Sequence, residues 1–539
     1  MHFSKYFFVA LFVLALVSFA SAQTIDSKKE FDEAELLFNL ENYEKALSHY
    51  LKVDSLRKNN PSINYKIGIC YLKSAIQKEK AIKFLELAAQ QASAKYQGVY
   101  LDNSAPLDAH FYLGLAYHIN YQFDDAVSSL EKYKNLVGKT DGLKLKEIDS
   151  RIQQAKNGKE LVAIPIPIKV ENIGRTINSS ADDYSPVFNA DESMLIYTSR
   201  RSGSTGNKVD KSGKYHEDIY VSYKTNDGWS TPLSIGSRIN SDGNEATVAL
   251  SADGQKLIIY KDDNGDGNLY TCNLEGNTWS TPKKMNDFIN SPYWESSASI
   301  SADGNVLYFS SNRPGGLGGK DIYRSKKLPN GEWGRPTNLG AAVNTAEDDD
   351  APFIHPDGFT LFYSSKGHKT IGGYDIFFTS AISDTGGWAE SFNMGYPVNT
   401  TEDDLFFVPT VGNNRAYYAS YKKDGMGEKD IYMITFTGAK EIPLTVYKGM
   451  VTDATGKVPD GLVISISDTK TNDIVGDYTP NSSTGKYLFI LTPGNSYQIS
   501  YLINGDEVLS ETLKVEESTS YSILNKAIDL KPVVLSVKK

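Results

Sequence analysis

Residues 301–323 read SADGNVLYFSSNRPGGLGGKDIY. A Ser-Ala-Asp-Gly turn leads into a run rich in β-branched and aromatic residues. A glycine-rich loop follows, and a second such run begins at Asp-Ile-Tyr. Asp and Gly favour tight turns, and β-branched and aromatic residues favour strands. The segment therefore predicts two short strands, and it has no following helix that would make its glycines a phosphate loop.

The same pattern recurs throughout residues 171–440. Each copy begins at an Ile/Val-Asn-Ser/Thr step, passes through a turn, and continues into Asp-Ile-Tyr or a relative of it. The steps centre on Asn178, Asn240, Asn290, Asn344 and Asn399. The turn aspartates of the middle copies are Asp253, Asp303 and Asp357, and the aspartates that open the second strand are Asp218, Asp321, Asp375 and Asp430.

A period of about 50 to 60 residues with four strands per unit is typical of a β-propeller. Five Asn steps predict five blades, and six blades is the alternative because closing strands are hard to count from sequence. A strand near 166–172 is expected to close the ring. Paired carboxylates such as Asp182-Asp183 are compatible with catalysis, but their recurrence in successive units favours a structural role in which carboxylates accept turn N–H groups.

Residues 23–156 show helical periodicity and a second repeat. Small residues recur where two helices of a hairpin touch, at Gly68 and Gly114 in first helices and at Ala46, Ala81 and Ala126 in second helices. Ala34 and Gly68 are 34 residues apart, whereas Gly68 and Gly114 are 46 apart, which predicts an insertion around 92–107. These are packing positions, and a linker with two prolines is expected over 157–170.

Residues 445–535 alternate strand-like runs with glycine turns and predict a small β-sandwich, followed by a tail at 536–539. The predicted fold class is thus multidomain, α plus all-β: an α-solenoid, a propeller and a sandwich. Cys70 and Cys272 fall in different predicted domains and are expected to be buried free thiols.

The N-terminus predicts export. Lys5, an apolar run over 6–19 and Ala20-Ser21-Ala22 form a secretory signal peptide over 1–22, and no Cys follows it to carry a lipid. We therefore expect a periplasmic or outer-membrane-associated protein that is not a lipoprotein. The net charge is -10 and no basic run occurs, so nucleic acid is not an expected partner.

The sequence offers one candidate cofactor site. Asp262, Asn264 and Asp266 alternate before a glycine, as in the first half of a calcium-binding EF-hand loop. The twelfth position is Asn273 rather than Glu, and helical flanks are not predicted, so we expect no cofactor, with calcium as the alternative. No metalloprotease pair of histidines, nucleophile elbow or phosphate loop occurs.

Three parts of the chain resemble known families. The stretch LFNLENYEKALSHYLKV (37–53) and its two relatives resemble tetratricopeptide repeats. The SADG turns with LYFSSN and DIY resemble the WD40-like (PD40) repeats of TolB and of Bacteroidetes envelope proteins. Gly449-x-Val451-x-Asp453 with Thr484-Gly485-x-Tyr487 resembles the carboxypeptidase regulatory-like domain.

The domain order resembles that of Bacteroidetes OmpA-family envelope proteins, including the type IX secretion subunit that anchors its complex to peptidoglycan. The OmpA-like domain of that family has no counterpart here, so we expect no direct peptidoglycan binding. The resemblance implies a non-enzymatic scaffold that docks other envelope proteins on the repeat groove and propeller face. The alternative is an accessory module that binds glycan or peptide in an outer-membrane transport complex. An enzyme ranks third because no hydrolase triad domain is present.

Overall fold

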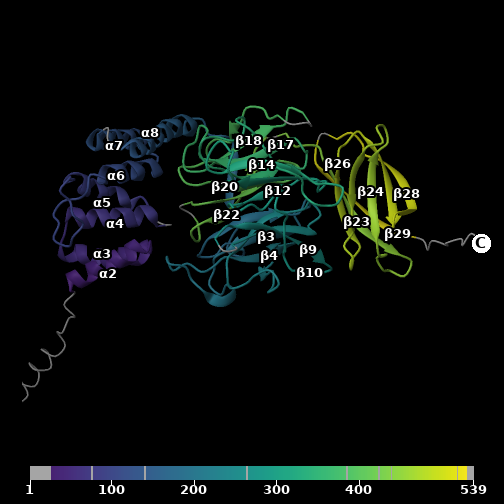
Figure 1. Ribbon diagram of the computed structural model, residues 1–539, viewed down its shortest axis with the longest axis horizontal. Helices are drawn as coiled ribbons and strands as arrows, with labels where there is room; N and C mark the ends of the chain where they lie inside the picture. The colour runs from purple at the N-terminus through teal and green to yellow at the C-terminus, as the bar shows by residue number, and fades with distance from the viewer. Residues whose placement is uncertain are drawn as a thin grey trace, which may run out of the picture. The chain divides into compact units, whose positions relative to one another are not determined.

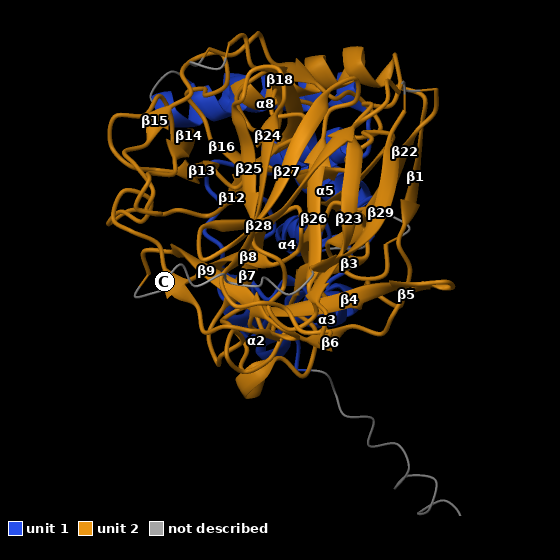
Figure 2. Ribbon diagram, turned by 90° about the vertical axis from the view of Figure 1, so that its right-hand side faces the viewer, with its two compact units in different colours: residues 1–149 blue, residues 150–539 orange. Residues whose placement is uncertain are grey.

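The fold is described from a computed structural model, over residues 26–530 apart from 75–76, 139–140, 263–264, 384–386, 423–424, 439 and 519. The predicted signal peptide and the tail at 536–539 lie outside these residues. The chain divides into two compact units that meet in sequence at residues 149 and 150 (Figure 2).

The first unit is built from helical hairpins (Figure 1). Its helices are α2 (Ser27–Asn39), α3 (Tyr43–Leu56), α4 (Pro61–Lys73), α5 (Lys80–Ala89), α6 (Ala109–Ile119), α7 (Phe123–Val137) and the start of α8 (Gly142–Val162). Helices α2 and α3, α4 and α5, and α6 and α7 pack in pairs. The segment between α5 and α6 corresponds to the predicted insertion.

Close helix contact explains the small residues of this repeat. A Cβ added to Gly68 would lie 2.5 Å from Leu85 Cγ, and one added to Gly114 would lie 2.6 Å from Leu130 Cγ. Ala46, Ala81 and Ala126 are fully buried. The helices of a pair approach until a leucine of one touches the backbone of the other, so larger side chains would force them apart.

The predicted linker is wrong at its start. We expected the last helix to end near 156, but α8 continues to Val162 through Asn157-Gly158. The Asn157 amide donates to the Thr370 carbonyl (3.1 Å) rather than ending the helix. Pro165 stops further helix because the residue before a proline disfavours helical geometry, and strand β1 (Ile168–Asn172) already begins inside the expected linker.

Residues 168–436 form five antiparallel sheets. In chain order, four of them are β2 (Asp183–Phe188), β3 (Met194–Ser199), β4 (Asp218–Thr225), β5 (Gly228–Trp229) and β6 (Leu233–Ser234); β7 (Glu245–Leu250), β8 (Lys256–Lys261), β9 (Asn268–Glu275), β10 (Thr278–Trp279) and β11 (Lys283–Lys284); β12 (Ala298–Ile300), β13 (Val306–Ser311), β14 (Asp321–Lys326) and β15 (Thr337–Asn338); and β16 (Asp349–Ile354), β17 (Thr360–Ser365), β18 (Asp375–Ser380) and β19 (Phe392–Asn393). The fifth contains β20 (Leu405–Pro409), β21 (Arg415–Ser420) and β22 (Asp430–Phe436). A short 3-10 helix, η1 (Thr205–Asn207), lies in the loop between β3 and β4.

The first strands of these sheets contact one another in a closed ring. Strand β2 contacts β7, β7 contacts β12, β12 contacts β16, β16 contacts β20, and β20 contacts β2. Radially arranged antiparallel sheets of this kind form a β-propeller. Strand β1 pairs with β22 in the last sheet, which confirms the prediction that a strand near 166–172 closes the ring.

The C-terminal part is a sandwich of two sheets. Its strands are β23 (Thr445–Asp453), β24 (Leu462–Asp468), β25 (Ile474–Tyr478), β26 (Lys486–Leu491), β27 (Ser496–Ile503), β28 (Asp506–Lys514) and β29 (Ser522–Leu530). One sheet has the order β26-β23-β29 and the other β25-β24-β27-β28. Tyr447, Phe489 and Ile464 belong to the core between them. In Figure 2 the sandwich lies in front of the propeller.

The helix contact at Gly68 gives a test. Alanine normally stabilises a helix relative to glycine by about 1 kcal/mol, but Gly68→Ala should destabilise the first unit by about 1 to 3 kcal/mol because its Cβ meets Leu85. Gly142→Ala is the matched control, since a Cβ there meets nothing within 4 Å. Urea denaturation should show a lower midpoint for Gly68→Ala alone, and equal midpoints would contradict the packing.

Candidate functional site

Each Asn step of the propeller is a clamp. The side-chain amide accepts from one backbone N–H and donates to the carbonyl of the same residue, which is the first residue after Asp or Asn in the third strand. Asn399 bonds Ile376 in this way at 2.7 and 2.9 Å. The pairs are Asn178 with Ile431, Asn240 with Ile219, Asn290 with Leu269, Asn344 with Ile322, and Asn399 with Ile376.

A buried carboxylate follows each clamp by five residues. It accepts from the backbone N–H directly after the clamping Asn, as Asp404 does from Thr400 (2.6 Å). The members of the set are Asp183, Glu245, Glu295, Asp349 and Asp404, and each is fully buried. Sequence reasoning noted acidic stretches here but not the single recurrent position, which the constant spacing from Asn could have revealed.

The structure places one series of the predicted repeat aspartates at the first positions of strands and the other series in hairpin turns. Asp218, Asp321, Asp375 and Asp430 are buried and accept backbone N–H groups of the preceding loop, for example from Ile371 to Asp375 (2.8 Å). Asp253, Asp303 and Asp357 accept the N–H two residues on, at 3.0, 3.1 and 2.8 Å. The carboxylates of both series thus accept hydrogen bonds from nearby backbone N–H groups, which is the contact that a structural role requires.

Loop glycines set the distance between neighbouring sheets. A Cβ on Gly318 would lie 2.5 Å from the Thr345 carbonyl oxygen, and one on Gly372 would lie 2.6 Å from that of Thr400. Gly427 stands in the same relation to Ser179, at 2.7 Å. Each glycine precedes its Asp by three positions, so the glycine-rich loops let one sheet's backbone approach the next.

Removing a clamp tests its contribution. Asn399→Ala leaves the buried N–H and C=O of Ile376 without their partner, which should lower the free energy of unfolding by about 2 to 4 kcal/mol. Asn226→Ala is the matched control because Asn226 is exposed in a hairpin turn. Thermal melts of both variants give the comparison, and an unchanged Asn399→Ala melt would refute the assigned role.

Burial raises the pKa of several of these carboxyls. The pKa of Asp349 rises to about 7, that of Asp375 to about 8 and that of Asp404 to about 6, with desolvation as the largest cause in each. By contrast, Asp183 and Glu295 have ion pairs with Arg201 (2.7 Å) and Arg313 (3.2 Å). The three carboxyls with these raised pKa values lie in or directly before strands of the fourth and fifth sheets.

These pKa values predict a pH dependence. The folded state holds the protons more tightly than the unfolded chain, so this stabilisation is complete below the ordinary carboxyl pKa and is lost as pH rises through about 6 to 8. The melting temperature should therefore fall between about pH 5 and about pH 8.5. The melting temperature of Asp349→Asn, whose side chain cannot ionise, should fall less steeply with pH. A pH dependence equal to that of the wild type would contradict the protonation of Asp349.

The structure describes two of the three residues of the calcium candidate. Asp262 accepts from the Gly265 N–H (2.9 Å) and Asp266 from the Asn268 amide (2.9 Å), while Asn264 lies outside the described residues. Among the residues described, no cluster of three His, Cys, Asp or Glu side chains could hold a metal ion. Cys70 and Cys272 are buried and free, as predicted, and burial raises the pKa of each thiol to about 12.

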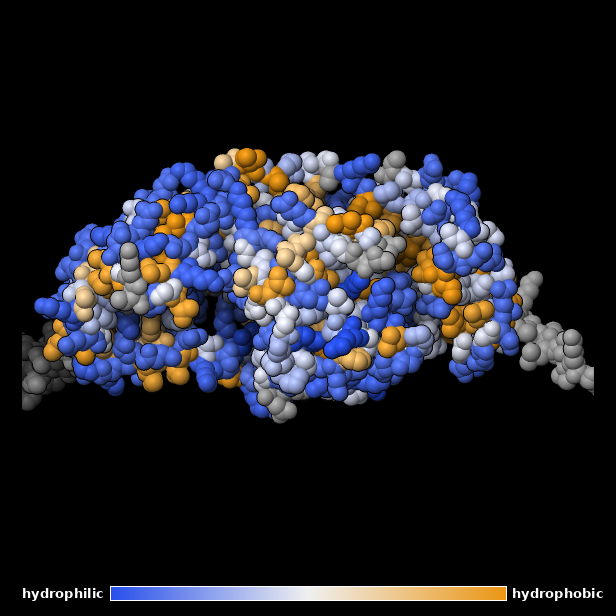
Figure 3. Space-filling model, turned by 45° about the horizontal axis from the view of Figure 1, so that its top comes forward, coloured by the Kyte–Doolittle hydropathy of each residue, from blue (hydrophilic) through white to orange (hydrophobic). Residues whose placement is uncertain are grey.

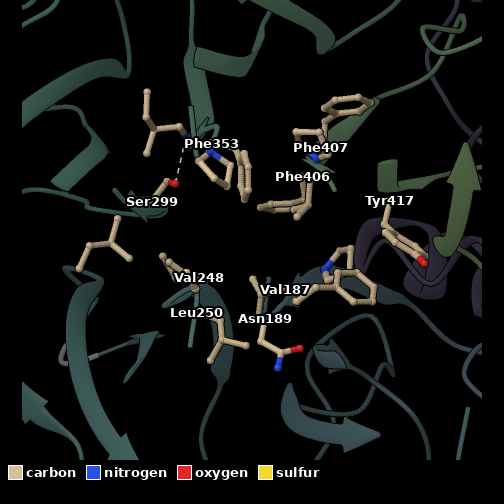
Figure 4. A pocket seen from close by; sticks show the side chains of 18 of the residues that line it. Val187, Asn189, Val248, Leu250, Ser299, Phe353, Phe406, Phe407 and Tyr417 are labelled. Carbon is tan, nitrogen blue, oxygen red and sulfur yellow. Dashed lines mark hydrogen bonds between the residues drawn. The ribbon is translucent and has the colours of Figure 1, made fainter. Parts of the chain in front are cut away.

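The propeller axis contains an apolar cavity of about 80 Å³. The first strands of all five sheets line it, and Val187, Val248, Phe353 and Phe406 are among the side chains drawn around it in Figure 4. The Ser299 hydroxyl accepts from the Ile354 N–H (3.1 Å), which ties two of these strands together.

The sandwich closes one end of this axis. Leu444, Val446, Leu488 and Ile490 pack in one apolar cluster with Val411 and with Ala190, Ala252 and Ala302 of three propeller turns. Glu192 is the carboxylate among the described residues lining the cavity, and it already accepts from Arg415 (2.5 Å) and the Tyr417 hydroxyl (3.0 Å). The cavity thus offers apolar contact rather than an acid–base pair.

Three lining strands carry the same backbone irregularity. Ser185, Ala351 and Phe406 have φ values of 50°, 49° and 57°, and each lies at a bulge in β2, β16 or β20. Such left-handed residues cost energy and persist only where the surroundings hold them. The bulges bring Phe406 to the axial cavity, where its ring lies 6.0 Å from that of Tyr184.

The insertion of the helical unit packs on the first helices. The Tyr100 ring lies 5.5 Å from that of Phe31 in α2, and the Asn60 amide donates to the Asp102 carbonyl (2.8 Å). Tyr96 lies 6.3 Å from Tyr65 in α4. The chain itself therefore covers part of the surface of α2 and α4, because aromatic side chains of the insertion pack against these helices.

The face of the molecule that is drawn in space-filling form does not single out one docking region. On the face drawn in Figure 3, hydrophobic groups form several separate patches within a hydrophilic surface. No helix among the described residues is long and apolar enough to cross a membrane. Enclosed or recessed regions are thus the more informative candidates for ligand contact.

Comparisons with known proteins give remote likenesses. No protein-family model and no curated protein sequence matches the chain. Among solved structures, TolB from Acinetobacter baumannii is similar at 17% identity and a TM-score of 0.32, covering 56% of this chain and 71% of that one. A putative TolB from Agrobacterium tumefaciens is similar at 16% identity and a TM-score of 0.27, covering 50% of this chain and 97% of that one. An alpha-L-arabinofuranosidase from Lactobacillus brevis is similar at 12% identity and a TM-score of 0.33, covering 48% of this chain and 91% of that one.

Proposed function

We propose that this protein is a non-enzymatic scaffold of the bacterial envelope that joins partner proteins through its helical repeats and its propeller. The observation that carries the proposal is the closure of the propeller axis by the sandwich. In the described lining of that axis the carboxylate is neutralised by Arg415, and the remaining contacts are apolar or already bonded. A closed, satisfied core of this kind suits a rigid support for surfaces.

The finer architecture belongs to the same proposal. We take the helical hairpins as tetratricopeptide repeats, each of the five sheets as one propeller blade, and the sandwich as a carboxypeptidase regulatory-like domain. We further propose that residues 1–22 are a signal peptide that directs the mature chain to the periplasm or the outer membrane. The domain order supports a complex of the kind built by OmpA-family or type IX secretion proteins.

A second role is favoured by the axial cavity. Its apolar side chains and the rings of Phe353 and Phe406 could receive an apolar group of a ligand from the end opposite the sandwich. The protein would then be an accessory module for peptide or glycan in an outer-membrane transport complex.

Co-purification from cross-linked envelopes tests the scaffold role. Deleting residues 27–149 behind the intact leader should remove at least one partner that the full chain recovers. The deletion ends at 149 because Gln154 and Asn157 bond Thr370 of the propeller (3.4 and 3.1 Å). The control is the propeller's melting transition, which should persist. An unchanged set of partners would count against docking on the helical unit.

A further inference from the structure

A second recess lies between the propeller and the sandwich, both within residues 150–539. Its volume is about 750 Å³. One wall comes from β23, β26 and β29, and includes Lys448, Met450 and Lys486; the other comes from propeller hairpins and includes Tyr223 and Lys224. We call this recess the lysine cleft.

The sandwich wall is the outer face of one sheet. Met450 is in register with Lys486 and Ala527, and Lys448 with Leu488 and Asn525, so these side chains share a face. Further along the same face, Val446, Leu488 and Ile490 pack against the propeller. This packing against the propeller covers one part of the sheet's outer face. The rest of that face, which includes Met450 and Lys486, lines the lysine cleft.

The lysine cleft has unbalanced positive charge. Its lining has four lysines, of which Lys448 pairs with Asp191 (2.6 Å) and Lys526 pairs with Glu511. Lys224 lies 4.7 Å above the Trp229 ring, and within the described chain neither it nor Lys486 has a carboxylate partner. Of the two lining carboxylates, Asp191 pairs with Lys448, whereas Asp253 accepts from the Gln255 N–H and keeps its negative charge, so lysines outnumber carboxylates in the described lining. In a chain of net charge -10, this is a local reversal of sign.

Apolar contact area lies in the same cleft. Met450 is 47% exposed and Tyr223 is 49% exposed. The amide side chains of Asn277 and Asn525 also line it and can bond a peptide backbone. A ligand that fits would combine carboxylates, an apolar side chain and hydrogen-bonding groups.

We propose that the lysine cleft binds an acidic peptide segment of a partner protein, with Lys224 and Lys486 contacting its carboxylates and Met450 and Tyr223 its apolar side chains. The inference rests on the proposed scaffold role and names the chemistry of one partner. An acidic glycan fits less well, because sugar rings stack on open aromatic faces and the described lining has one exposed aromatic side chain, Tyr223, while its other aromatic side chain, Tyr487, is buried. Flexible methionine suits peptide side chains of varied shape.

Fluorescence anisotropy tests the proposal on the mature full chain. The probe is a fluorescein-labelled peptide of Glu-Asp-Leu repeats, compared with Lys-Arg-Leu repeats of the same length. The acidic peptide should bind and weaken with added salt, and the basic peptide should not bind. Lys224→Glu with Lys486→Glu should weaken binding by about tenfold or more, because attraction becomes repulsion.

The matched control is Lys283→Glu with Lys326→Glu, two exposed propeller lysines outside the cleft. An equal loss of acidic-peptide affinity in both double variants would overturn the proposal. Binding of polygalacturonate in place of the peptide would also overturn it. A second readout is alkylation of Met450→Cys, which the acidic peptide should slow; Cys70 and Cys272 are buried and give little background. Failure here with partners still recovered from cross-linked envelopes would refute the lysine cleft alone and leave the scaffold role standing.

Discussion

The propeller depends on one repeated interaction, the pairing of an asparagine side-chain amide with the N–H and C=O of a single strand residue. The chain leaves each sheet at the clamping asparagine. Five residues later, at the buried carboxylate, it begins the next sheet. Because the amide has one donor and one acceptor side, it completes a strand edge as another backbone would. Asn178 makes the same bond to Ile431, 253 positions away, so one clamp also joins the beginning of the propeller to its end.

The clamps explain why other repeat residues are small or acidic. With the crossing fixed, Gly372 must lie against the Thr400 carbonyl, and a side chain there would push the sheets apart. Asp375 and Asp404 are then enclosed where water cannot solvate their charge, which raises the pKa of both. The same geometry that holds the ring together thus makes its stability sensitive to pH.

The sandwich changes what the propeller can offer to partners. Its β23 and β26 side chains fill one end of the axis, so the apolar cavity behind them is not open on that side. The uncovered part of the same sheet faces propeller hairpins across the lysine cleft. Binding chemistry therefore arises at a junction of two folds, which is a common place for ligand sites.

The sequence was sufficient for the repeats, because each repeat must bury the same faces and uses the same residue types to do so. Helical spacing marked Gly68 and Gly114 as contact points, and the Asn, Asp-Gly and Asp-Ile-Tyr series marked the propeller and the strand that closes it. The end of α8 was predicted wrongly because a linker with two prolines was expected from residue 157, whereas the helix continues to Val162 and its Asn157 bonds Thr370, distant in sequence. The insertion that covers α2, the sandwich that closes the axis and the lysine cleft were all beyond the sequence pattern. Each depends on segments far apart in the chain, and their contact is set by packing in three dimensions rather than by local periodicity.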